Sequence, residues 1–266
     1  MIKWWGGILA LVLLGLWLLT CAASAESANL VQNGSFEEGF VQGVGKGWTG
    51  FQNGGDIVYG FQSDDWDRAV FDGEYSQLIK LDTGGVGGSQ PDRYAGIYQV
   101  VDVVPNARYM FSFYGLVRST EGTEKQSGYN YRVQVGYDFN GGTDPWAVTN
   151  WVEMDRWREH PMDKPGRFDS YAHGVTTTSD KLTIFIRVWK KFPTAHETAM
   201  VNLDAISLLG PAPARKATSA TPQPQEPSSP PTLPQTGGGS PWLFAGLALG
   251  LIGVGLHMLR VLRFHA

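Results

Sequence analysis

The stretch Leu182-Thr-Ile-Phe-Ile-Arg-Val-Trp189 decides the fold class, because aliphatic residues alternate with other residues along its whole length. Successive side chains of a β-strand point to opposite faces, so the four aliphatic residues share one face. The other face carries Phe185, Arg187 and Trp189. The pattern predicts a strand with one face in a core and an opposite face that mixes aromatic rings with a charge.

Other segments repeat this alternation between turns that are rich in glycine and asparagine. Strands are predicted at residues 97–104, 109–117 and 131–139. Turns are predicted at residues 53–55, 84–85, 87–88 and 140–142. The sequence shows no long amphipathic helix and no internal repeat. Many short strands joined by Gly-rich turns predict an all-β fold, an antiparallel β-sandwich.

Residues 26–210 form one predicted domain, which is acidic. They hold 24 acidic and 16 basic residues, a net charge of −8. This balance argues against nucleic-acid binding, which needs a basic footprint. The carboxylates are suitable ligands for calcium. The single cysteine, Cys21, precedes this domain, which therefore depends on its core rather than on disulfides.

The opening stretch Asn29-Leu-Val-Gln-Asn-Gly-Ser-Phe-Glu-Glu-Gly39, with Gly47 and Trp48 after it, resembles the start of a β-jelly-roll family. It is similar to the carbohydrate-binding modules of families four, nine and twenty-two, in the galactose-binding-domain-like superfamily. Further similar stretches follow in the family's order at residues 72–78, 97–105, 108–113 and 201–208. The resemblance spans nearly all of residues 26–210 and implies a jelly roll whose first and last strands meet.

The same resemblance implies a structural calcium ion beside these two strands. The matching positions are Glu37 and Asp204, and Asp72 or a backbone carbonyl near it would complete the site. Calcium takes several hard oxygen ligands, so carboxylates from distant segments would pin two ends of the chain together. In the alternative interpretation, Glu37 caps a turn and Asp204 is a solvated strand residue.

The tryptophans pose the functional question. Trp48 matches a core position of the family and is interpreted as structural. Sugar rings pack flat C–H faces on indole while their hydroxyls pair with polar neighbours. The candidate ligand-binding residues are Trp66, Trp151, Trp157, Trp189 and Arg187, and Trp146 belongs to the same unassigned group. Residues 151–157 are expected to form a loop at the edge of a cleft. For any one tryptophan taken alone, filling the core or bracing a long loop is the favoured interpretation, because aromatic side chains bury large areas.

The N-terminal segment, residues 1–25, predicts a signal peptide. Lys3 supplies a positive start, and residues 8–19 are almost wholly apolar. The triplet Ala23-Ser-Ala25 offers a cleavage site after Ala25. A retained signal anchor and lipidation at Cys21 are the alternatives, although Thr20 stands where a smaller residue is usual in lipoprotein signals.

The C-terminal part predicts a stalk and a membrane span. Residues 211–240 are rich in proline, serine and threonine, a composition that does not fold and that favours extended conformations. Residues 241–259 carry no charge, and at about 1.5 Å per helical residue they match the hydrocarbon thickness of a bilayer. The basic tail at residues 260–266 predicts a cytoplasmic C-terminus.

The tail as a whole resembles a sortase sorting signal of the LPxTG kind, carried by Leu233-Pro234-Gln235-Thr236-Gly237. The resemblance implies that a sortase-type transpeptidase recognises Leu233 and Pro234, cleaves between Thr236 and Gly237, and joins the chain to an envelope amine. In the alternative, no enzyme cleaves here and the span itself is the anchor. Both predict a protein anchored to the membrane or cell wall on the extracellular face of a bacterial cell.

Catalysis is the weaker interpretation of this sequence. His160, His173 and His196 lack metal-ligand spacing, and the domain has neither a Gly-x-Ser-x-Gly motif nor a cysteine nucleophile. A glycosidase pair of carboxylates is the minor alternative, because its members need only meet in space. The sequence therefore predicts a non-catalytic, calcium-braced carbohydrate-binding module. The main alternative is a surface structural or protein-adhesive domain without glycan binding, which burial of Trp66, Trp146, Trp151, Trp157 and Trp189 would favour.

Overall fold

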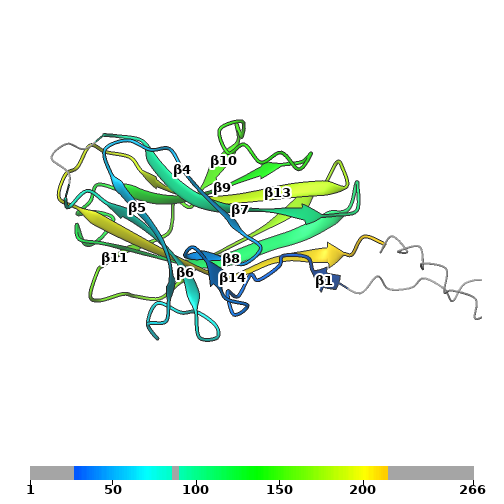
Figure 1. Ribbon diagram of the computed structural model, residues 1–266, viewed down its shortest axis with the longest axis horizontal. Coiled ribbons are helices and arrows are strands. Elements are labelled where there is room, and N and C mark those ends of the chain that lie inside the picture. The colour runs from blue at the N-terminus through cyan, green and yellow to red at the C-terminus, as the bar shows by residue number, and fades with distance from the viewer. Residues whose placement is uncertain (1–26, 86–89, 215–266) are drawn as a thin grey trace, which may run out of the picture. The chain divides into compact units, whose positions relative to one another are not determined.

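The computed structural model describes residues 27–85 and 90–214 (Figure 1). These residues contain no helix, and hence none that would cross a membrane. The predicted signal peptide with its cleavage site at Ala25, most of the stalk, the motif at Leu233–Gly237, the span at 241–259 and the tail at 260–266 lie outside the described residues.

One layer of the fold is a five-stranded antiparallel sheet, in the order β10-β9-β13-β7-β4. Its strands are β4 (Thr49–Gln52), β7 (Arg93–Asp102), β9 (Tyr131–Asp138), β10 (Trp151–Glu153) and β13 (Lys181–Lys190). The alternating stretch that predicts a strand at 182–189 is thus the central strand of this sheet. The strands predicted from residues 97 and 131 are confirmed as β7 and β9.

The other layer is a seven-stranded sheet, in which β11-β8-β14-β6-β5 form a path, β1 pairs with β14 and β12 pairs with β8. Its strands are β1 (Ser27–Asn29), β5 (Val58–Asp64), β6 (Ser76–Asp82), β8 (Arg108–Ser119), β11 (Glu159–Pro161), β12 (Asp169–Thr176) and β14 (Thr198–Pro211). Only β11 runs parallel to its neighbour among the strands of this sheet. A short hairpin of β2 (Phe40–Val41) and β3 (Val44–Gly45) accompanies them.

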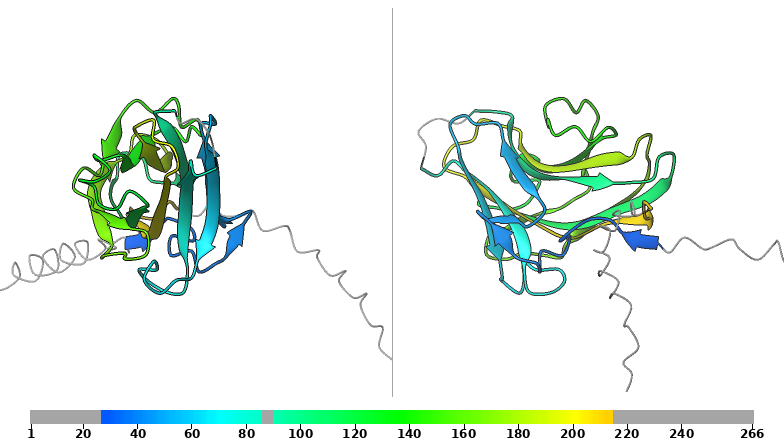
Figure 2. Two further views of the ribbon diagram at one scale, coloured as in Figure 1. Left: turned by 90° about the vertical axis from the view of Figure 1, so that its left-hand side faces the viewer. Right: turned by 45° about the vertical axis from the view of Figure 1, so that its right-hand side comes forward.

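The two sheets lie face to face around one hydrophobic core, as Figures 1 and 2 show. The aliphatic side chains of β13 enter this core and are fully buried, as their alternation predicts. Trp48 is also buried, and its indole nitrogen donates a hydrogen bond to the backbone oxygen of Asn33 at 3.3 Å. The structural interpretation of Trp48 is confirmed, and so is the antiparallel β-sandwich.

The first and last strands of the domain meet, as expected. Ser27 lies opposite Pro211 in the antiparallel pair of β1 and β14. Between Asp204 and Ser207 the register of β14 on β8 shifts, and Ala205 has a φ of 47° at this bulge. A bulge of this kind bends the strand and turns side chains away from their regular positions. Asp204 and the backbone of the loop at 71–75 come together beside it.

Candidate functional site: an aromatic sheet face

The outer face of the five-stranded sheet collects aromatic side chains from four strands and one loop. We call the following eight residues the aromatic face: Phe51, Tyr94, Tyr98, Trp146, Trp151, Phe185, Arg187 and Trp189. The strand register explains the grouping, because residues directly opposite one another in a sheet share a face. Trp189 lies opposite Tyr94, and Phe185 lies opposite Tyr98.

Two glycines create the space in which these rings lie. Gly96 is opposite Arg187 and Phe51, and a Cβ atom there would lie 2.6 Å from the Phe51 ring. Gly136 is opposite Trp151, and a Cβ atom there would lie 3.0 Å from the indole. The first distance is too short for a methyl group, and the second would force the indole to shift, so the rings occupy positions that other residues would fill with side chains.

Trp146 comes from the loop between β9 and β10, which stands above the upper sheet in Figure 1. Its ring makes edge contacts with Phe51 at 6.0 Å and with Tyr94 at 6.2 Å, measured between ring centroids. Because Phe51 and Tyr94 belong to β4 and β7, the loop reaches across β13 to the other side of the sheet. The Trp146 side chain remains 50% exposed, which leaves an indole surface available to a ligand.

Arg187 lies at the centre of the aromatic face between two rings. Its guanidinium carbon is 3.6 Å from the ring centroid of Trp151 and 4.1 Å from that of Tyr94. Its Nε donates a hydrogen bond to Oε1 of Gln134 at 2.7 Å. The residue is only 8% exposed, and this burial lowers the pKa of Arg187 to about 10, so the group stays charged at neutral pH.

Polar groups border the rings on the side of Trp189. The indole nitrogen of Trp189 donates a hydrogen bond to Asp92 at 2.9 Å, and its ring stacks on Tyr94 at 6.0 Å. Lys191 lies over the same indole at 4.6 Å. Glu153 forms ion pairs with Arg132 at 3.5 Å and with Lys191 at 3.9 Å. Hydrogen-bonding groups therefore alternate with aromatic surface, as recognition of a polar ring compound requires.

The structure brings together three of the five predicted ligand-binding residues, namely Trp151, Trp189 and Arg187. Sequence reasoning left the other aromatic members of the face unassigned. Tyr94 and Tyr98 carried a usable signal, because two tyrosines four positions apart in one strand lie on the same side of a sheet. Trp146 offered no such signal, since its loop has no period from which a direction follows.

The prediction that Trp157 binds a ligand is wrong, because the structure places this residue in the core. It is 7% exposed and packs in the core, 5.3 Å from the Phe113 ring and against Gly115, where a Cβ atom would lie 2.2 Å from the indole. Its indole nitrogen donates to the backbone oxygen of Ser170 at 3.2 Å. The expected loop at residues 151–157 is instead strand β10 followed by a turn that inserts Trp157 into the core.

Trp66 lies apart from the aromatic face. It follows β5 of the seven-stranded sheet, and its half-buried ring lies 5.1 Å from the guanidinium of Arg118 and 5.6 Å from that of Arg68. Arg118 in turn donates hydrogen bonds to Asp64 and Asn202. Trp66 thus covers a buried polar network rather than joining Trp151 and Trp189.

The carboxylates predicted to bind calcium hold a turn instead. Asp204 is fully buried; its Oδ2 accepts hydrogen bonds from the backbone N–H groups of Phe71 and Asp72, and its Oδ1 accepts one from Ala205. Oε1 of Glu37 accepts two further backbone hydrogen bonds, from residues 74 and 75 at 2.9 Å each. Both carboxylates therefore accept hydrogen bonds from the backbone of the same turn, at residues 71–75.

This donor set does not fit a calcium ion. Calcium takes six to eight oxygen ligands, whereas both oxygens of Asp204 already face N–H donors. Within residues 27–85 and 90–214, no group of three or more His, Cys, Asp or Glu side chains is arranged to hold a metal. Burial raises the pKa of Asp204 to about 6, although its three N–H partners act in the opposite direction. Asp204 is therefore not a solvated strand residue either.

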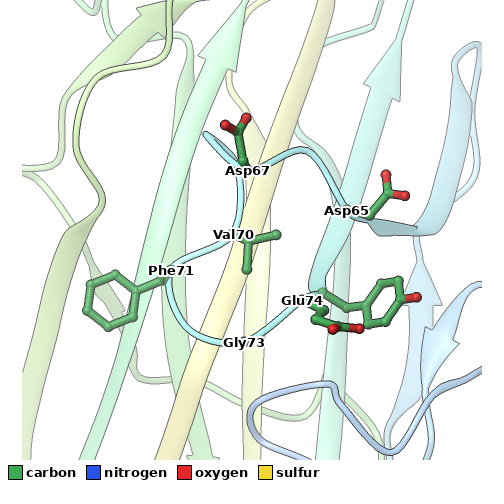
Figure 3. Close-up of a pocket in the computed structure, with 7 residues that line it drawn as sticks. Asp65, Asp67, Val70, Phe71, Gly73 and Glu74 are labelled. Atoms are coloured by element: carbon green, nitrogen blue, oxygen red, sulfur yellow. The ribbon is translucent and has the colours of Figure 1, made fainter. Parts of the chain in front are cut away.

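A hollow of about 530 Å³ lies beside the same turn, on the seven-stranded sheet (Figure 3). The residues that line it are Asp65, Asp67, Val70, Phe71, Gly73, Glu74 and Tyr75. Figure 3 shows the Phe71 ring pointing away from the carboxylates of the loop. That ring stacks on Tyr114 at 3.6 Å and meets Phe168 at 5.7 Å. The hollow is acidic and presents fewer ring surfaces than the aromatic face.

No known family model matches the sequence, and no curated protein sequence matches it. Among solved structures, a family 61 carbohydrate-binding module in complex with β-1,4-galactotriose has a TM-score of 0.39 and 12% identity, over 68% of this chain and 98% of that chain. A family 16 carbohydrate-binding module has a TM-score of 0.35 and 21% identity, over 68% and 100%. The K1 cleaved adhesin domain of Lys-gingipain from Porphyromonas gingivalis has a TM-score of 0.41 and 16% identity, over 67% and 96%. These scores are low, so the sandwich assignment rests on the two sheets of this chain.

Proposed function

We propose that this chain is a non-catalytic carbohydrate-binding protein and that the aromatic face is its ligand site. The observation that carries the proposal is the convergence of Trp146, Trp151 and Trp189, from three separate segments, on one side of one sheet. Indole rings offer flat apolar surface to the C–H faces of a sugar. Polar groups among them, such as Gln134 and Asp92, are suited to its hydroxyls.

The exposure of the rings favours this function over a purely structural or protein-adhesive domain. A structural role alone would leave the tryptophans buried, as Trp48 and Trp157 are. Trp146 is half exposed instead, and Trp151 and Trp189 are intermediate. The strands β10 and β13 also hold the rings of Trp151 and Trp189 in place before a ligand arrives, which limits the entropy lost on binding.

The enzymatic alternative has little support at the aromatic face. Glu153 is engaged by Arg132 and Lys191, and Asp92 accepts the hydrogen bond of the Trp189 indole. A glycosidase needs one carboxyl that stays protonated near neutral pH and a second close partner. Binding without turnover is the function that these side chains support.

The proposal includes the surface location inferred from the termini. Export by residues 1–25, a stalk at 211–240 and a tether at 233–266 would hold the domain away from the envelope of a bacterial cell. A sortase-type transpeptidase would cut at Thr236–Gly237, or the span at 241–259 would remain as the anchor. The protein would then attach the cell to a polysaccharide, or a polysaccharide to the cell.

Affinity electrophoresis and a glycan array with the purified chain test the proposal. Trp146→Ala is the informative variant because half of this side chain is exposed, so its loss has little effect on folding. Phe71→Ala is the matched control, an aromatic residue of similar exposure (44%) in the loop between β5 and β6, away from the aromatic face. We expect Trp146→Ala to lose about tenfold in affinity, or about 1.4 kcal/mol, and Phe71→Ala to bind as the natural chain does. Absence of binding to every glycan would favour the protein-adhesive alternative.

A further inference from the structure

Arg187 is a nearly buried charge whose surroundings do not neutralise it. No carboxylate of the described residues lies within ion-pair distance of its guanidinium. The neighbouring cations of the same face, Arg132 and Lys191, share Glu153. Removing a charge from water without a counter-charge costs free energy, and contact with two rings offsets this cost only in part. An anion bound at Arg187 would offset the rest of this free-energy cost.

The geometry leaves one part of the guanidinium free for such a ligand. The guanidinium lies over the rings of Trp151 and Tyr94, and Nε is bonded to Gln134. The two terminal nitrogens of Arg187 form no hydrogen bond with the described residues, and they are not among the fully buried polar atoms that lack a partner. They are therefore in contact with solvent. Two adjacent N–H donors in one plane match the two oxygens of an oxyanion.

We infer that the aromatic face binds an acidic glycan, and that Arg187 receives an oxyanion carried by the sugar while neighbouring tryptophans take the sugar ring. This inference rests on the function proposed above and specifies its ligand class. The shared chemistry is a pyranose that bears a carboxylate, as in a hexuronic acid, or a sulfate ester. A neutral sugar would offer Arg187 hydroxyl acceptors alone, which form weaker hydrogen bonds than an ionised group.

The charge of the rest of the domain makes this selectivity local. Residues 26–210 carry a net charge of −8, so long-range attraction of polyanions is disfavoured. Any preference for an acidic glycan must therefore come from groups at the contact itself. This also removes non-specific ion exchange as a source of false binding, a frequent problem when basic proteins are tested on acidic polymers.

The experiment is a glycan array and affinity titration of the purified chain on polymers that share a backbone but differ in charge. Each set contains an acidic polymer and its neutral counterpart: de-esterified and fully methyl-esterified polygalacturonate in the uronate set, and native and desulfated carrageenan in the sulfate set. The variants are Arg187→Gln, Arg187→Lys, and Lys181→Gln as matched control. Lys181 is a cation of the same strand, 49% exposed and paired with Asp102, and it lies outside the aromatic face. Free galacturonate and galactose serve as competitors of the natural chain.

We expect an acidic member of one set to bind at least tenfold more tightly than its neutral counterpart. The uronate and sulfate arms identify which oxyanion is recognised. Arg187→Gln should lose at least tenfold of that affinity, Arg187→Lys should lose less, and Lys181→Gln should change it less than twofold. Free galacturonate should compete better than galactose when polygalacturonate is the ligand, and this result does not depend on how the variants fold.

Two results would overturn the inference, and they differ in what they mean for the proposed function. Equal binding of neutral and acidic polymers, with Arg187→Gln unchanged, would show that Arg187 only bridges Tyr94 and Trp151, and carbohydrate binding would stand. Binding of no polymer in any set would reject the carbohydrate function together with its ligand class.

Discussion

Two buried charged residues show how their surroundings decide their roles. Arg187 lies between aromatic rings and keeps free N–H donors. Asp204 lies among three backbone N–H groups that use both of its oxygens. Arg187 therefore keeps N–H donors without a protein acceptor at the surface, whereas the hydrogen bonds of Asp204 are all made within the fold. We therefore expect Arg187 to matter for binding and Asp204 to matter for stability.

The buried state of Asp204 predicts a specific pH dependence of stability. Its pKa is about 6 in the folded chain and 3.8 in the ordinary state. Between these values the folded chain holds a proton that the unfolded chain has released. The contribution of Asp204 to the free energy of unfolding is therefore fully present below pH 3.8 and falls as pH rises through 6. The size is at most about 3 kcal/mol, from about 1.4 kcal/mol for each pKa unit.

Asp204→Asn isolates this contribution, because asparagine does not titrate. Urea unfolding of both chains should show that the free energy of unfolding of the natural chain falls, relative to that of Asp204→Asn, from pH 4 to pH 6.5. The difference between the two chains is measured at each pH. It should stay constant above pH 7. Measuring the difference removes other groups, such as Glu159, whose pKa is also raised by burial. A difference that does not vary with pH would contradict the role assigned to Asp204.

The fate of individual tryptophans was the least predictable part of the sequence. Trp189 and Arg187 lie in a strand, so alternation alone assigned them to the face opposite the core. Trp146 and Trp157 lie outside the strands and have no period. The first came to lie over the aromatic face and the second in the core. Which of these happens depends on contacts with distant segments, which composition does not reveal.

At the scale of elements, the bulge in β14 is a point of backbone strain. Ala205 has a φ of 47°, a left-handed conformation that costs a non-glycine residue about 1–2 kcal/mol. Ala205→Gly should raise the free energy of unfolding by about 0.5–1 kcal/mol, since relief of strain exceeds the added freedom of the unfolded chain. Chemical denaturation measures the change. Ala199→Gly, the same substitution in the buried part of β14, should destabilise the chain instead.

The turn at 71–75 leads to a prediction about metal. Its backbone N–H groups bond directly to Glu37 and Asp204, so it needs no ion to hold it. We expect the melting temperature of the chain to be the same in millimolar calcium and in chelator. Glu37→Ala should lower the free energy of unfolding by about 1 kcal/mol in both conditions, and Glu38→Ala, its exposed neighbour, should have little effect. If calcium stabilised the natural chain and Glu37→Ala abolished this effect, a calcium ion would bind at Glu37 after all.

Elements were far more predictable than their contacts. Alternation located the strands that became β7, β8, β9 and β13. The glycine clusters at 53–55, 84–85 and 140–142 lie in connections between strands, and the turn predicted at 87–88 lies outside the described residues. The resemblance to jelly-roll modules correctly implied that the first and last strands meet. It also implied a calcium ion at Glu37 and Asp204, where the structure has hydrogen bonds to a turn. A carboxylate can bind a calcium ion or accept hydrogen bonds from backbone N–H groups, so the sequence alone does not distinguish these two roles.

At the scale of the whole molecule, the sorting motif predicts a covalent product. If a sortase acts, the mature chain released from the cell wall by a wall hydrolase should end at Thr236 and carry an envelope fragment. Mass spectrometry of the C-terminal peptide measures this directly. Thr236→Ala should move the chain to the membrane fraction with residues 237–266 intact, while Gln235→Ala, at the variable position of the motif, should leave attachment unchanged. A natural chain that retains residues 237–266 in the membrane fraction would instead identify the span at 241–259 as its anchor.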